Sequence, residues 1–329
     1  MTLGVVPVRA GLMMTMVIVA QALTSSVGTA QQQPNHDPAA AKLVFSDIEL
    51  FWEAYDRAGP GTRAEVLRDE YLKKGSPGLE EFTRERIDNA QSLAAAVEKH
   101  PKYYASLRGP SREVPGHEDA IRATFRRLAD LYEPAAFPDV YFVIGRMNSG
   151  GTLTEKGLLI GVEMYGLAED TPVDELGNWH RAVVKPVGDI PYIVAHELIH
   201  YQQKYPEEGA TLLGMAIMEG SADFVGELIS GRTANPHLHE YGDPREAELW
   251  EEFKGEMDGE DASNWLYQGD RAKGRPADLG YYVGYKICRS YYEDAADKKA
   301  AIKAIMEIKD FREFLAASKY ESKLARRHR

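Results

Sequence analysis

The sequence predicts an α+β fold that is mainly helical and contains a small sheet. Helical periodicity runs from about residue 43 to residue 132, strand-like segments follow at 139–147 and 157–166, and helical periodicity then returns. Strands that are followed by a run of helices favour an α+β arrangement over a doubly wound sheet. With 329 residues, the chain is long enough to bury a sizeable core.

Residues 1–30 have the pattern of a secretory signal peptide. Arg9 gives a sparse positive start, the apolar stretch GLMMTMVIVAQAL follows, and Gly28 and Ala30 are small residues that a signal peptidase accepts. We therefore expect cleavage after Ala30, no stable membrane insertion of the mature chain, and a linker at 31–42. Cys288 is the only cysteine, so no disulfide can form within the chain. These features predict an exported bacterial protein that is periplasmic or secreted.

The next segment, 43–135, is predicted to be an N-terminal helical subdomain, and 136–329 is predicted to be the functional domain. Three amphipathic segments indicate helices before residue 135: SDIELFWEAYDRA at 46–58, PGLEEFTRERIDNAQSLAAAVEKH at 77–100 and HEDAIRATFRRLADLY at 117–132. Proline at the following position ends the second of these helices.

The functional domain is expected to begin with its strands. The segments 139–147 and 157–166 are predicted to be neighbouring strands joined by a glycine-bearing hairpin. Four helical segments come next, at 190–204, 211–230, 243–257 and 280–308. Pro206 stops the first of these helices and Gly231 closes the second.

The helix at 190–204 carries the motif HELIH. His196 and His200 are four positions apart, so their imidazoles lie on one helix face and can converge on one ion. Neutral imidazole nitrogens are good zinc ligands, and a hydrolytic zinc site usually has three protein ligands and a water molecule. Glu197 follows the first histidine and is placed to take a proton from such a water.

A third ligand is available on the next predicted helix. Glu219 follows His200 after eighteen intervening residues, enough for one helix to end and a second to run back alongside it. Asp223, one turn further on, is expected to accept the free N–H of a ligand histidine and fix its orientation. Gly220 and Ala222 are small enough to leave room between these two helices. We therefore predict one Zn2+ per chain, held by two histidines and one glutamate.

These residues resemble the gluzincin metallopeptidases, which hold zinc with two histidines and one glutamate. More closely, the chain from about residue 139 resembles a bacterial family of predicted zinc-dependent proteases of unknown function, on the segments HELIHYQQ, MEGSADFVGELI and LGYYVGYKIC. The resemblance implies a zincin-like fold with the HExxH motif on its active-site helix. It also implies a zinc peptidase that acts on a peptide or protein substrate. A metzincin would need glycine and histidine where this chain has Gln203 and Pro206, which excludes that branch.

Several further residues have two possible interpretations. Related gluzincins use tyrosine or histidine to stabilise the negative charge that builds during peptide hydrolysis, which makes Tyr281 the candidate and Tyr282 its alternative, against packing in the core. His180 is an alternative donor or an ordinary loop histidine. The strand at 157–164 either pairs with an extended substrate or lies inside the sheet.

Two loop features are weaker candidates. His237 and His239 alternate in NPHLHEYGDP and could hold a second zinc, although such residues usually face solvent. Arg271 and Arg275 could hold a substrate carboxylate, although loop arginines are usually solvated.

The formal net charge of -12 argues against a nucleic-acid partner, because phosphate binding needs a basic surface. The prediction from sequence is thus an exported zinc peptidase with Glu197 and Tyr281 as catalytic residues. The alternative is a zinc-stabilised, non-catalytic envelope protein with a binding or chaperone-like role. A third possibility is a metal-free helical module in which the motif is accidental.

Overall fold

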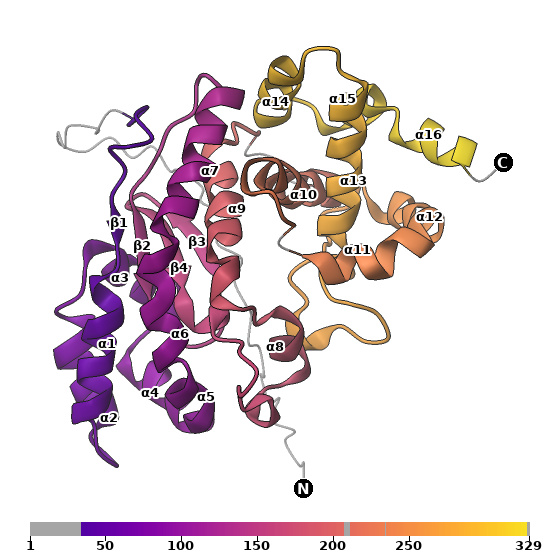
Figure 1. Ribbon diagram of the computed structural model, residues 1–329. Coiled ribbons are helices and arrows are strands. Elements are labelled where there is room, and N and C mark those ends of the chain that lie inside the picture. Colours follow the sequence, from indigo (N-terminus) through magenta and orange to yellow (C-terminus); the bar gives the residue numbers. More distant parts are fainter. Residues whose placement is uncertain (1–33, 207–210, 234, 328–329) are drawn as a thin grey trace, which may run out of the picture. The chain divides into compact units, whose positions relative to one another are not determined.

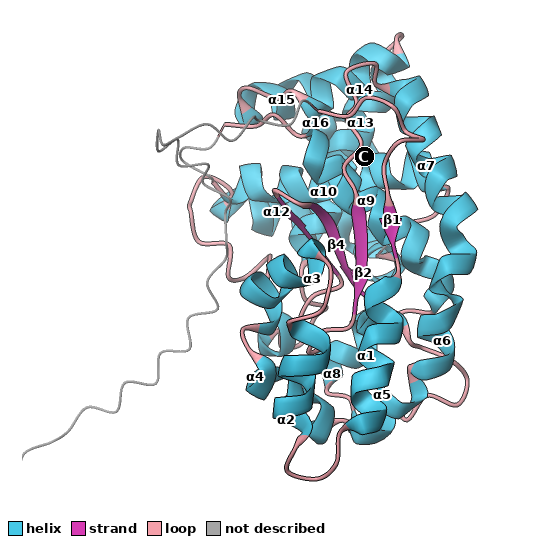
Figure 2. Cartoon of the chain, turned by 90° about the vertical axis from the view of Figure 1, so that its left-hand side faces the viewer, coloured by secondary structure: helices cyan, strands magenta, loops and turns pink. Residues whose placement is uncertain are grey.

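Four strands form the only sheet of the residues that the structure describes, with the order β1-β2-β4-β3. The strands are β1 (Leu43–Val44), β2 (Val140–Val143), β3 (Gly151–Thr154) and β4 (Gly157–Gly161). β2 lies parallel to both β1 and β4, whereas β3 is antiparallel to β4. The structure is a computed structural model in which residues 34–206, 211–233 and 235–327 are described, and Figure 2 shows strands of the sheet between helices.

The predicted hairpin between 139–147 and 157–166 is wrong. β2 and β4 are neighbours, as expected, but they run parallel. The segment between them contains β3, a strand that forms the hairpin with β4 through a tight turn ending at Gly157, where φ is +137°. This extra reversal of the chain brings β4 back in the direction of β2.

Seven α-helices of the described chain precede β2. They are α1 (Ser46–Arg57), α2 (Arg63–Val66), α3 (Pro77–Phe82), α4 (Ala90–Lys99), α5 (Pro101–Ser106), α6 (Arg108–Glu113) and α7 (Glu118–Leu131). The single helix predicted at 77–100 is instead divided between α3 and α4. Asp88 has a φ of +75° there, which no helix accommodates, and the side chain of Asn89 caps α4 by accepting the N–H of Ser92 at 2.9 Å.

Nine α-helices follow the sheet in the described residues. They are α8 (Asn178–Val183), α9 (Ile190–Gln202), α10 (Leu212–Ser230), α11 (Pro236–Gly242), α12 (Glu246–Glu256), α13 (Leu279–Asp294), α14 (Lys298–Met306), α15 (Phe311–Ser318) and α16 (Tyr320–Arg327). None of the helices in the described ranges is both long and apolar enough to cross a lipid bilayer.

The two helices that carry the HELIH and MEGSAD segments are apolar on nearly every side. α9 has Pro191 in its first turn and ends at Gln202, where the chain becomes extended. α10 is capped by the Thr211 hydroxyl and closed by Gly231 in the left-handed conformation. Helices with so little polar surface must be covered by neighbours on most sides.

α9 and α10 lie at the centre of the packing. α9 contacts β3, β4, α7 and α10, and α10 contacts α9, α7 and α13 (Figure 1). α1 and α3 pack against β2, and every residue of β2 and β4 is buried, so both faces of these strands are covered. The mainly helical α+β fold with a small sheet is therefore confirmed.

The sequence predicted four consecutive regions, of which the structure describes the last two and part of the linker. The signal peptide at 1–30 lies outside the described residues, as does the start of the linker at 31–42. Residues Pro34–Arg329 form one compact unit, in which β1 from the predicted N-terminal subdomain pairs with β2. The boundary between 43–135 and 136–329 stays a prediction.

Candidate metal centre

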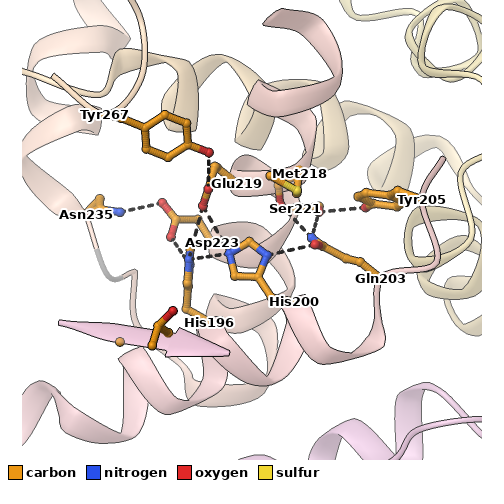
Figure 3. Close-up of polar contacts among 12 residues, drawn as sticks. His196, His200, Gln203, Tyr205, Met218, Glu219, Ser221, Asp223, Asn235 and Tyr267 are labelled. Atoms are coloured by element: carbon orange, nitrogen blue, oxygen red, sulfur yellow. Dashed lines mark hydrogen bonds and ion pairs between the residues drawn. The ribbon is translucent and has the colours of Figure 1, made fainter. Parts of the chain in front are cut away.

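Three side chains from α9 and α10 meet where the two helices pack together. His196 and His200 are one turn apart on α9, and Glu219 faces them from α10 (Figure 3). The side chains of His196 and Glu219 are buried, and that of His200 is 16% exposed. The helix pair thus brings together the three residues that were predicted to hold a metal.

The three potential ligand atoms are closely spaced. His196 Nε2 and His200 Nε2 are 3.0 Å apart, and Glu219 Oε2 lies 3.6 Å from the first and 3.2 Å from the second. Ligands at about 2.0–2.1 Å from a tetrahedral zinc ion are separated by roughly 3.3 Å. The donor set therefore fits zinc in both chemical type and spacing. It is the one group of three or more potential ligands among the residues that were described.

Each imidazole is oriented by a contact at its other nitrogen. His196 Nδ1 lies 2.8 Å from Asp223 Oδ1, and His200 Nδ1 lies 2.9 Å from Gln203 Oε1, both acceptors for an imidazole N–H. A donating Nδ1 leaves the lone pair of Nε2 free to bind a metal. The expected position of Asp223 beside a ligand histidine is what the geometry shows.

The amide of Gln203 is itself held in place. Its Nε2 donates to Met218 O at 2.7 Å and to Ser221 Oγ at 2.9 Å, and Tyr205 OH lies 2.9 Å from the same hydroxyl. The carbonyl end of Gln203 is thereby turned toward His200. Because α9 stops at Gln202, the side chain of Gln203 can fold back on the helix end.

Two loop residues complete the surroundings. Tyr267 OH donates to Glu219 Oε1 at 2.7 Å, which leaves Oε2 facing the histidines. Asn235 Nδ2 donates to Asp223 Oδ2 at 2.8 Å. Sequence reasoning identified neither residue nor Gln203. The position of Gln203, three residues after His200, could have indicated that it contacts that histidine. Nothing in the sequence indicated the roles of the two loop residues.

Interactions within the cluster favour the protonated form of His196 and the ionised form of Glu219. Burial by itself would lower the pKa of His196, but hydrogen bonds with Asp223 and Glu219 raise it well above its usual value. Burial likewise opposes charge on Glu219, yet the charge of His200 and hydrogen bonds from both histidines hold its pKa well below its usual value. A divalent cation would take the place of the imidazole protons.

Glu197 and Tyr281 lie beside this cluster and line a cavity of about 230 Å³ together with His196. Burial raises the pKa of Glu197, and the absence of a side chain at Gly151 leaves room for its carboxylate, since an added Cβ there would lie 2.5 Å from Oε1. The ring of Tyr281 is stacked on that of His196, with centroids 6.1 Å apart. Tyr282 points elsewhere and donates to Asp243 at 3.1 Å.

The other histidine candidates take separate positions. His180 Nε2 donates to Met147 O at 2.9 Å, and the ring of His239 packs on Tyr285 at a centroid distance of 4.5 Å. His237 lines the cavity. Among the described residues, neither His237 nor His239 belongs to a group of three potential metal ligands, so the second zinc site is not formed there.

Both loop arginines are occupied by contacts away from the cavity. Arg271 donates to Tyr267 O at 2.7 Å, and Arg275 donates to both carboxylate oxygens of Glu252 at 2.8 Å. Residues 157–161 of the predicted strand form β4, which lies inside the sheet because it pairs on both sides, and the chain continues as a 3-10 helix over Val162–Tyr165. The interior interpretation of that strand is therefore the correct one.

The family of the chain follows from comparison with known proteins. A family described as gliding motility protein GldB matches residues 66–322, which include most of the N-terminal helices and the whole candidate metal centre. No curated protein and no solved structure matches the chain. The zincin-like fold thus stays a prediction.

This match overturns part of the interpretation from sequence. The assignment to a zinc peptidase family is wrong, because the matching family is described by gliding motility and not by peptidase activity. The prediction of a hydrolase with a peptide substrate is wrong for the same reason, and the hydrolytic roles of Glu197 and Tyr281 lose their basis. Because the match covers more than three quarters of the sequence, this chain belongs to the family of the gliding motility protein GldB.

Proposed function

We propose that the chain is a non-catalytic protein of the bacterial cell envelope that serves gliding motility by binding another protein. The family match supports this role and the envelope location, since the family is one of gliding motility lipoproteins. In this proposal His196, His200 and Glu219 hold one zinc ion that ties α9 to α10. The ion stabilises the protein and fixes the wall of the neighbouring cavity.

The closely spaced donor set is the observation that carries the metal part of the proposal. Three ligand atoms lie 3.0 to 3.6 Å apart, and two of them belong to imidazoles whose other nitrogens have acceptors. Structural zinc sites usually have four protein ligands and are rich in cysteine, whereas this site offers two histidines and one glutamate. The sole cysteine, Cys288, is fully buried in α13 and is no part of this site. A three-ligand site leaves one coordination position for water or for a bound group.

The metal part is tested by analysis of the purified protein. We expect about one zinc per chain in wild type, and a loss of zinc in His200→Ala. His117→Ala is the matched control, because His117 is a partly exposed histidine outside the metal centre. Less than about one zinc per ten chains in protein never exposed to chelator would refute a metal centre.

The envelope role is tested in the source bacterium. We expect deletion of the gene to reduce colony spreading, and wild-type protein or His117→Ala to restore it. His200→Ala should restore spreading poorly, provided that immunoblots show equal protein levels. Normal spreading of the deletion strain would contradict the proposed role.

A further inference from the structure

A lysine with no carboxylate partner lies at the cavity beside the metal centre. Lys185 lines this cavity, and within the described part of the chain its Nζ donates only to Ala182 O, at 3.3 Å. No carboxylate of the described residues lies within 4.0 Å of that nitrogen. Burial lowers the pKa of Lys185, against the opposing effect of the more distant Asp189. An ammonium group in such a place is incompletely solvated and incompletely neutralised.

The backbone of Lys185 is fixed on both sides. Its N–H donates to Met164 O at 2.9 Å, and its carbonyl accepts the N–H of Leu167 at 3.0 Å. Both partners belong to the segment that follows β4. The backbone that carries the Lys185 side chain is therefore fixed before a ligand binds, which reduces the conformational entropy lost on binding.

His237 adds an uncharged group to the same wall. Its Nδ1 is buried and has no hydrogen-bond partner in the described structure. Burial, and then the charge of Lys185, lower the pKa of His237 to about 4, so the ring is neutral at pH 7. A neutral imidazole supplies one N–H donor and one acceptor.

The acidic residues of the cavity limit the charge of any ligand. Three carboxyl groups line the cavity, those of Asp189, Glu197 and Asp278. Asp189 lies 3.6 Å from Arg232, and Asp278 accepts the N–H of Gln268 at 3.0 Å, so these two have polar partners. A dianionic phosphate would meet repulsion from these groups, whereas a single carboxylate near Lys185 would meet less. The rest of the cavity wall includes apolar side chains, which can pack against an apolar group next to the ligand's carboxylate. These side chains are Met164, Trp179, Val183, Ile193 and Leu238.

We propose that this cavity binds a carboxylate on a peptide segment of the partner protein, with Lys185 as its ion-pair partner and His237 as a hydrogen-bonding neighbour. The inference rests on the proposed function, because it names the chemistry of the partner. The carboxylate belongs either to an acidic side chain or to the end of the partner chain. An adjacent leucine-like side chain packs on the apolar wall.

Binding of three short peptides tests the proposal. N-acetyl-aspartyl-leucinamide offers a side-chain carboxylate, N-acetyl-leucyl-leucine offers a chain-end carboxylate, and N-acetyl-asparaginyl-leucinamide offers none. We expect at least one carboxylate peptide to bind about tenfold tighter than the asparaginyl peptide, measured by titration calorimetry on the full chain. Trp179 provides a second readout by fluorescence, because Trp52, Trp250 and Trp265 are at most 2% exposed.

The variants separate the ion pair from general binding. Lys185→Met should remove the preference for carboxylate, and Lys185→Arg should retain most of it, with circular dichroism confirming that both fold. Lys303→Met is the matched control, because Lys303 is exposed on α14. A preference that survives in Lys185→Met, or equal binding of all three peptides to wild type, would overturn the proposal.

Parallel titrations of zinc-loaded and chelator-treated protein distinguish the two proposals. A carboxylate preference in protein that retains no measurable zinc even after zinc loading would leave the cavity assignment intact and refute the metal centre. Bound zinc without any preference would refute the cavity assignment alone.

Discussion

At the scale of single residues, the proposed metal centre depends on side chains that orient its potential ligands. Asp223 accepts from the Nδ1 of His196 and is held by Asn235. We predict that Asp223→Ala lowers the zinc affinity about 10- to 100-fold, because the imidazole loses its fixed orientation. Competition with a chromophoric chelator measures this change. Asp170→Ala, at an exposed position, should leave the affinity unaltered, and a folded Asp223→Ala protein with wild-type affinity would contradict the prediction.

Sequence reasoning succeeded at this scale where helical spacing determines which side chains share a face. His196, His200 and Asp223 are each placed by a four-residue step, and the packing of α9 on α10 brings Glu219 to them. Tyr267 could not be found in this way. It reaches Glu219 from a loop whose path depends on the packing of the whole C-terminal half, which no local spacing encodes.

At the scale of elements, close approach of helices depends on glycine at the points of contact. An added Cβ at Gly284 would overlap the backbone carbonyl of Ala216, and one at Gly220 would overlap the backbone of α13. Gly220 thus makes room for α13, and not for α9 as its place in the MEGSAD segment had indicated. Gly226 is the glycine of α10 that faces α9, with an added Cβ 3.4 Å from His196 N.

We predict that Gly284→Ala lowers the free energy of unfolding by about 1–3 kcal/mol, because α10 and α13 must separate to admit the methyl group. The higher helix propensity of alanine offsets up to about 1 kcal/mol of this cost. Urea denaturation measures the change. Gly255→Ala in α12 is the matched control, since its added Cβ would meet nothing within 4 Å, and it should be neutral or slightly stabilising. Equal stability of both variants would exclude the steric explanation.

The strands show where element prediction from sequence reaches its limit. The apolar runs at 139–147 and 157–166 correctly indicated β2 and β4. The glycine-bearing segment between them was interpreted as the turn of a hairpin, yet Gly151–Thr154 is strand β3. Pairing with β4 and packing against α9 stabilise this strand, and both interactions are tertiary.

At the scale of the whole molecule, a ligand set and an activity are separate conclusions. Two histidines and a glutamate define what an ion would meet, and helical geometry makes that set predictable from the sequence. Whether the site turns over a substrate depends on the cavity and the partner, which the motif does not encode. The match to the gliding motility family over residues 66–322 corrected the function while leaving the predicted ligand cluster in place.

A buried carboxyl group makes the stability of the whole molecule depend on pH. Glu163 is fully buried and accepts the N–H groups of Gly145 at 2.8 Å and Met147 at 3.1 Å. Burial raises its pKa from 4.5 to about 7, despite these hydrogen bonds. The folded state therefore holds the Glu163 proton more tightly than the unfolded state does. Its contribution to stability is complete below pH 4.5 and is lost as the pH rises to about 7.

We predict that the free energy of unfolding of wild type, relative to Glu163→Gln, falls by about 3 kcal/mol between pH 4.5 and pH 7.5, because each pH unit of the interval contributes about 1.4 kcal/mol. Urea denaturation of chelator-treated proteins at several pH values measures this difference and removes any contribution from metal release. Glu260→Gln, at an exposed position, should follow the wild-type curve throughout. Parallel curves for wild type and Glu163→Gln would mean that Glu163 is ionised in the folded protein across the whole range, so that the N–H groups of Gly145 and Met147 outweigh the cost of burying its charge.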